Sequence, residues 1–100
     1  MSKIEKLEDL TSEEILLLGE GEEQKRYEPA IIGMAYRFGI QPIVAYDYQK
    51  VIDILAEDIG HEDAREYFDY NILGAWVGEA TPIFIEIIEY QEGEYVLQEK

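Results

Sequence analysis

The chain has no cysteine, only two serines and no long apolar run. Without cysteine it can form no disulfide, no thiolate nucleophile and no cysteine-based zinc site. Ser2 and Ser12 lie in a polar N-terminal stretch and at a predicted helix start, which argues against a serine nucleophile. No apolar run approaches the roughly 20 residues that span a bilayer, and the N-terminus lacks the apolar stretch of a signal peptide. We therefore expect a cytoplasmic protein with no membrane partner.

Basic residues are scarce as well. Eight lysines and arginines stand against 23 aspartates and glutamates, so the net charge is −15. Such a chain should be repelled by nucleic acid phosphates and by anionic lipid. We expect no direct binding to nucleic acid, whereas a basic protein is a complementary partner. The simpler alternative is that the acidic residues only keep the protein soluble.

The acidic residues are unevenly distributed along the chain. Residues 29–46 contain no acidic residue and one basic residue, Arg37, whereas residues 47–79 contain nine acidic and two basic residues. The acid-free segment is therefore predicted to be the most buried part of the fold.

The N-terminal part predicts a tail, one short helix and a connector. Residues 1–9 are polar and are expected to form a flexible tail. Thr11 and Glu14 fit a capping box, which predicts a helix that ends at Gly19. Residues 19–28 are charged and show no apolar period, so they are expected to connect this helix to the next element.

The acid-free segment predicts a β-hairpin. Apolar residues alternate along residues 30–38, and a second strand is expected at residues 43–46 after a turn at residues 39–42. The alternative is a helix from Pro29 to Phe38 with Gly39 after its end.

Two helices follow. Asp47 is placed to cap the first, which ends at Gly60, and the second begins beside His61 and ends at Gly74. The connection is very short, so the helices should form an antiparallel hairpin. Asn71 falls on the apolar stripe of the second helix, where it would need hydrogen-bond partners.

Residues 83–88 are rich in β-branched side chains and predict a strand. The alternative is a helix capped by Thr81. Residues 95–97 could add a last edge strand. Together these elements predict one α+β domain over residues 1–100, of which residues 10–100 are folded. The expected element order is α-β-β-α-α-β, with an optional final strand. A helical hairpin would pack on a short, mainly antiparallel sheet in a two-layer arrangement.

Several stretches of the chain are similar to stretches of known proteins: AIIGMAYRFG, PIVAYDYQKVIDIL, EDAREYFDYNILGAWVGE and TPIFIE. In them the chain resembles a group of small, functionally uncharacterised proteins encoded mainly by bacteriophages and prophages. The resemblance implies a mobile-element origin and a location in the cytoplasm of a bacterial host. It implies no catalytic residue.

Catalytic and cofactor motifs are weak. Carboxylate pairs are too frequent to single one out, and the glycines of residues 19–23 alternate with acidic residues where a phosphate would bind. The single histidine, His61, is expected to be a solvated residue at a helix start; the alternative is a metal ligand with its acidic neighbours. We therefore expect no enzyme, no cofactor and no metal site.

Two sets of residues are candidates for binding. The first could line a small-ligand pocket: Tyr46, Asp47, Asn71, Trp76, Glu79 and Thr81. Trp76 could instead close the open end of the core. The second set lies on the helical hairpin and could contact a protein: Asp53, Glu57, Asp58, Glu62, Asp63, Glu66, Asp69 and Tyr70.

The leading functional hypothesis is a non-enzymatic acidic binding protein of phage type. It would inhibit a basic, nucleic-acid-binding host protein by mimicking nucleic acid. One alternative is a protein that binds a small ligand such as a nucleotide or metal, or a small enzyme. The other is a homo-oligomeric phage component, for example a homodimer through an edge strand.

Overall fold

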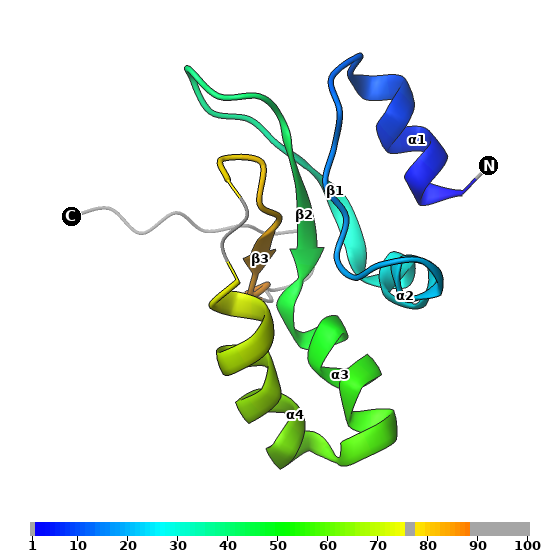
Figure 1. The fold of residues 1–100 in the computed structure, drawn as a ribbon, viewed down its shortest axis with the longest axis vertical. Helices are drawn as coiled ribbons and strands as arrows, with labels where there is room; N and C mark the ends of the chain where they lie inside the picture. The colour runs from blue at the N-terminus through cyan, green and yellow to red at the C-terminus, as the bar shows by residue number, and fades with distance from the viewer. Residues whose placement is uncertain (1, 76–77, 89–100) are drawn as a thin grey trace.

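The computed structural model of the chain describes residues 2–75 and 78–88. These residues form two short helices, a β-hairpin, a helical hairpin and a third strand (Figure 1). The elements are α1 (Lys3–Leu10), α2 (Glu22–Tyr27), the 3-10 turn η1 (Glu28–Ala30), β1 (Ile31–Ala35), β2 (Ile43–Asp47), α3 (Tyr48–Ile59), α4 (His61–Tyr67), the π-helical η2 (Phe68–Leu73) and β3 (Ile83–Ile85). The predicted α+β class with a helical hairpin is confirmed.

The three strands form one sheet in the order β1-β2-β3. β1 and β2 pair antiparallel, as predicted for the hairpin, so the helix alternative for this segment is wrong. β3 confirms the first half of the strand predicted at residues 83–88, but it ends at Ile85. It pairs parallel to β2, with Ala45 opposite Ile83. The sheet, expected to be mainly antiparallel, is therefore mixed. A parallel pair needs a long crossover connection, and the helical hairpin supplies it.

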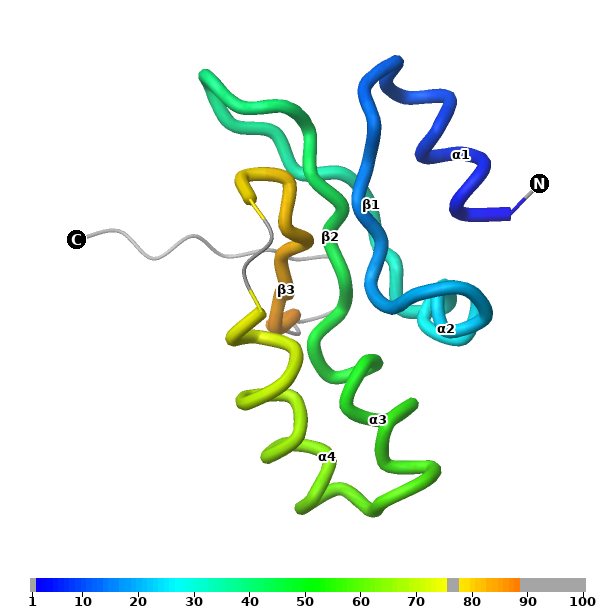
Figure 2. Tube along the Cα trace, in the orientation of Figure 1, coloured from blue at the N-terminus to red at the C-terminus, as the bar shows by residue number. Residues whose placement is uncertain are grey.

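The end of the β-hairpin is more exposed than predicted. β1 stops at Ala35, although the strand was expected to reach residue 38. Tyr36 is 67% exposed and Phe38 is fully exposed. In Figure 2 the turn of the hairpin projects away from α3 and α4, so these helices do not cover it. The acid-free segment is thus buried at its base and solvated at its tip.

The helical hairpin begins and turns where the sequence predicted. The side chain of Asp47 accepts a hydrogen bond from the backbone N–H of Lys50 at 3.2 Å, which caps α3. Gly60 has a φ of 83°, a left-handed backbone that favours glycine, and it separates α3 from α4. At Phe68 the second helix widens into a π-helix. Gly74 follows it with a φ of −80° and is not the left-handed cap that was predicted.

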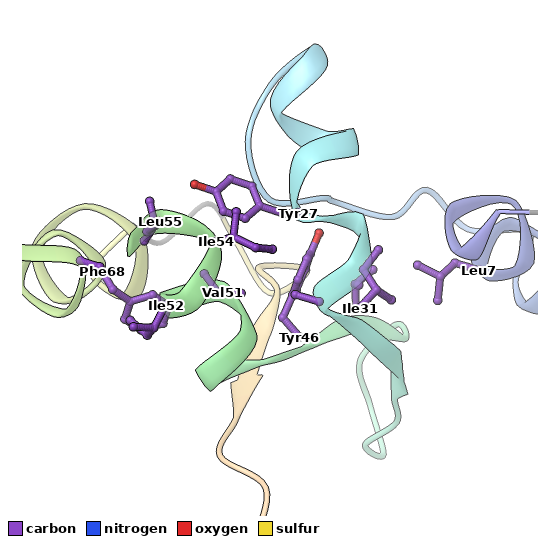
Figure 3. Packing of buried hydrophobic residues seen from close by; sticks show 12 residues of the cluster. Leu7, Tyr27, Ile31, Tyr46, Val51, Ile52, Ile54, Leu55 and Phe68 are labelled. Atoms are coloured by element: carbon purple, nitrogen blue, oxygen red, sulfur yellow. The ribbon is translucent and has the colours of Figure 1, made fainter. Parts of the chain in front are cut away.

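Aromatic rings join the helical hairpin to the sheet. The ring of Phe68 packs edge-on against Tyr48, with centroids 5.1 Å apart, and against Phe84 of β3, with centroids 4.8 Å apart. The ring of Phe84 in turn lies 5.8 Å from that of Tyr46 in β2. Figure 3 shows how the buried cluster continues from Phe68 to Leu7. The core is therefore one chain of contacts from the helical hairpin to the N-terminus.

The N-terminus is a docked helix where the sequence predicted a flexible tail. Ser2 and Glu5 form a reciprocal capping box, and Leu7 is only 3% exposed. The ammonium group of Lys3 donates hydrogen bonds to the carbonyl oxygens of Pro29 and Ile31, both at 2.9 Å. Because these partners lie more than 25 residues along the chain, the local polarity of residues 1–9 gave no indication of them.

The helix predicted to end at Gly19 and the connector predicted at residues 19–28 were also wrong. Residues 11–18 are not helical, and the hydroxyl of Thr11 accepts from the N–H of Glu13 instead of forming the predicted box with Glu14. The apolar run of residues 15–18 is too short to offset the cost of starting a helix, so it packs against the core as an extended segment. The predicted connector contains α2, and Tyr27 at its end is only 5% exposed.

Replacing Phe68 with alanine should lower the free energy of unfolding by about 3–5 kcal/mol, because it removes a fully buried ring that contacts Tyr48 and Phe84. Urea denaturation followed by circular dichroism measures the change. Phe38→Ala makes the same deletion at an exposed position, and it should change stability by only about 0.5 kcal/mol or less. Equal losses in the two variants would contradict this account of the core.

Candidate interaction surface

The helical hairpin exposes every residue of the predicted protein-contact set. α3 buries Val51, Ile52, Ile54 and Leu55, and the second helix buries Ala64 and Phe68. The acidic residues occupy the remaining positions and stay in solvent. We call these the acidic helical surface: Asp53, Glu57, Asp58, Glu62, Asp63, Glu66 and Asp69, with Tyr70 beside them.

Two of the seven carboxylates have partners. Asp58 accepts from the guanidinium of Arg26 on α2 at 2.8 Å, and this hydrogen bond raises the pKa of Arg26. Arg26 also donates to the carbonyl oxygen of Ile54 at 2.9 Å, so it ties α2 to α3. Sequence reasoning did not identify Arg26, since its partners lie on another element.

Asp53 is the second paired carboxylate. It accepts from the amide of Gln49 at 3.0 Å, and Nε2 of His61 lies 3.0 Å from it. These contacts lower the pKa of Asp53, the Gln49 hydrogen bond most, which keeps the group ionised at neutral pH. Within the residues that the structure describes, the other five carboxylates form no ion pair.

His61 contacts Asp53 rather than the acidic residues of the first turn of α4. Among residues 2–75 and 78–88, no three histidine, aspartate or glutamate side chains converge as metal ligands would. The contact joins the beginning of α4 to the outer face of α3.

The predicted small-ligand set is not brought together. Tyr46 is fully buried, and its hydroxyl accepts a hydrogen bond from the N–H of Leu18 at 2.8 Å. Asp47 caps α3. Both side chains therefore have structural partners, and neither lines the two hollows described below, while Trp76 lies outside the described residues.

The remaining members of the set lie at two separate hollows. Asn71 is exposed on η2, not on a buried stripe as predicted, because the π-helix changes which positions face the core. It lines a hollow of about 750 Å³ together with Thr81. Thr81 also borders a second hollow of about 430 Å³, which includes Glu79.

The aromatic tip of the β-hairpin is exposed, which the sequence pattern did not predict. Tyr36 and Phe38 were assigned to a buried strand face, but both are exposed. The available signal was the position of Phe38, directly before Gly39 at the predicted turn. Tyr70, which was predicted to be exposed, is 79% exposed. Tyr90, which follows the predicted strand of residues 83–88 and is a second tyrosine that could contact a partner, lies outside the described residues.

Comparison of the chain with protein-family models, with curated proteins and with solved structures finds no match. In the described part of the chain, no helix combines the length and the apolar character needed to cross a membrane. Function must therefore be argued from the surface itself.

Replacing Tyr46 with phenylalanine should lower the free energy of unfolding by about 1–2 kcal/mol, since the N–H of Leu18 loses its acceptor in a partly buried site. Urea denaturation measures the loss. Tyr36→Phe removes a hydroxyl from an exposed ring and is the matched control, expected to leave stability unchanged. If both variants unfold at the wild-type midpoint, the hydrogen bond does not stabilise the fold.

The stability difference between wild type and Tyr46→Phe should also depend on pH. Burial raises the pKa of Tyr46, so the unfolded chain loses this proton first as pH rises above about 10. The contribution of Tyr46 is then complete below that pH and decreases as pH rises through its raised folded-state pKa. Urea midpoints of both proteins measured from pH 8 upwards test this. A stability difference between wild type and Tyr46→Phe that stays constant as pH rises through the raised folded-state pKa of Tyr46 would contradict it.

Proposed function

We propose that this protein is a non-enzymatic binding protein that docks its acidic helical surface on a basic protein of a bacterial host. The observation that carries the proposal is that all seven carboxylates are exposed, five of them without an ion pair in the described chain. Such an array attracts the same lysines and arginines that otherwise hold phosphates. The partner class is therefore a nucleic-acid-binding protein, and the mode of action is nucleic-acid mimicry.

The distribution of charge favours docking over solubility alone. Acidic residues that serve only solubility have no reason to avoid residues 29–46. Residues 1–28 and 47–79 each contain nine acidic residues, but the first stretch has four basic residues and the second only two, so the helical hairpin is the less neutralised of the two. In Figure 1 the helical hairpin forms one end of the molecule, away from the turn of the β-hairpin. A localised field of one sign speeds and orients encounter with a partner of opposite sign.

Tyr70 gives this surface an apolar contact. It is 79% exposed beside Asp69, on the helical turn that follows α4. Tyrosines are enriched among the residues that dominate binding energies, because they combine a large apolar ring with a polar end. We assign Tyr70 as the anchor of the interface and the carboxylates as the groups that steer the partner.

The resemblance to phage and prophage proteins supports the same proposal. A protein made from a mobile element acts in the cytoplasm of its host, where basic nucleic-acid-binding proteins are abundant. Inhibition of such a protein requires only that the acidic surface occupy the site of the nucleic acid. No catalytic group is needed.

Affinity capture from bacterial lysate tests the proposal. The wild type should retain basic proteins at low salt and release them near 1 M salt, where the Debye length is about 3 Å. The variant Glu57→Gln, Glu62→Gln, Asp63→Asn and Glu66→Gln should lose them, because it removes four unpaired carboxylates from the acidic helical surface.

The matched control removes four charges elsewhere: Glu8→Gln, Asp9→Asn, Glu13→Gln and Glu14→Gln, all exposed near the N-terminus. It has the same net charge as the first variant and should still capture the partner. Equal loss in both variants would show that only net charge matters. For a captured protein, duplex DNA should compete with binding, and failure to compete would contradict mimicry.

A further inference from the structure

The tip of the β-hairpin has a composition that neither its turn nor the core explains. Tyr36, Arg37 and Phe38 are all exposed, and Phe38 contributes nothing to the buried cluster. Turns usually carry small or polar residues, each for a backbone reason that phenylalanine does not meet. An exposed aromatic pair on a projecting hairpin is typical of a contact surface.

A hollow of about 430 Å³ lies beside the turn of the same hairpin. Its apolar wall includes Ala35, Ile40, Ile43 and Ile83, and Glu79 borders it from the segment before β3. Its volume is within the range of about 300–1,000 Å³ that small-ligand sites show, so it can hold one aromatic side chain. Phe38 does not fill the hollow of its own copy, because its ring is fully exposed although its neighbours Tyr36 and Arg37 line the wall.

Charge indicates what occupies this surface. Each copy of the chain carries −15, so two copies repel each other over most of their surfaces. The hairpin itself is less negative, since residues 29–46 contain no acidic residue and carry Arg37, and the acidic residue brought beside its turn is Glu14, whose backbone carbonyl accepts from the amide of Gln41 at 2.7 Å. A basic protein would instead be drawn to the acidic helical surface at the other end of the molecule (Figure 1). The acid-free tip thus favours a second copy of this chain.

We propose that two copies associate through their β-hairpins, with Phe38 of each copy in the hollow of the other. Arg37 of one copy would then lie beside Glu79 of the second copy. In the described chain neither residue forms an ion pair of its own. Tip and hollow are neighbours on one surface, so a two-fold axis satisfies both contacts at once and closes the assembly as a dimer.

This inference goes beyond the proposed function and does not depend on it. The contact surface is only the end of one hairpin, well below the roughly 800 Å² per partner of a standard interface, so the dimer is weak. Its affinity rests on the aromatic side chains rather than on area.

Sedimentation equilibrium over a wide concentration range tests the contact. The wild type should approach a dimer at high concentration, and Phe38→Ser should weaken association about tenfold or more. Tyr70→Ser is the matched control: it removes an equally large exposed ring from the acidic helical surface and should dimerise like the wild type. A wild type that stays monomeric throughout, or equal association of Phe38→Ser and wild type, would overturn the proposal.

Charge exchange provides a second test that does not alter the aromatic residues. Arg37→Glu and Glu79→Arg should each weaken the dimer several-fold, and the double variant should recover most of the loss. High salt should not abolish dimerisation, because it screens the repulsion between the copies. Loss of the dimer at high salt, or no recovery in the double variant, would overturn the assigned contacts.

The proposed docking on a basic protein and the proposed dimer can each be disproved without the other. Phe38→Ser should still capture a basic protein, since the acidic helical surface is intact, and the carboxylate-to-amide variant of that surface should still dimerise. A single variant that abolishes both activities would overturn the separation of the two surfaces.

Discussion

The packing of Phe68 between Tyr48 and Phe84 is the interaction on which the rest of the structure depends. Parallel strands cannot be joined by a tight turn, so the pairing of β2 with β3 needs a long crossover that returns to the same sheet. The helical hairpin is that crossover, and Phe68 is its fully buried contact with β3. Without this contact no aromatic packing would hold the helical hairpin against β3.

The packing of the helical hairpin against the sheet also decides where its charged residues lie. Because one face of each helix is used in the core, the acidic residues of α3, α4 and η2 are left on the outer faces. Arg26 and His61 each engage one carboxylate, at positions that also join neighbouring elements. The remaining carboxylates have no such structural use, which is why we interpret them as a surface for binding.

The molecule therefore has two dissimilar ends. One carries the acidic helical surface, and the other carries α1 together with a projecting β-hairpin whose own residues include exposed aromatic side chains and no acidic side chain (Figure 1). Our two proposals assign partners of different character to these ends: a basic surface to the first and the low-charge apolar hollow of a second copy to the other. The fold keeps the two ends apart, because the sheet and its buried cluster lie between them.

Elements with strong local signals were determined by the sequence itself. Asp47 capped the predicted helix, Gly60 marked its end, and the β-branched run after residue 82 became β3. The exposure of the carboxylates on the helical hairpin followed as well. The apolar stripe of α3 faces the core, so its acidic residues lie on the opposite, exposed face. These signals act over a few residues, where backbone preference and helical periodicity decide the outcome.

Tertiary structure alone decided the elements whose partners are distant in sequence. The docking of α1 depends on Leu7 and on carbonyl oxygens near β1, and the extended path of residues 15–18 ends in the bond from Leu18 to the buried Tyr46 hydroxyl. The π-helix turned Asn71 outward, and the tip of the β-hairpin stayed exposed because no helix of the described residues covers it. Local propensity carries no information about such contacts, because their free energy comes from surfaces that meet only once the chain has folded.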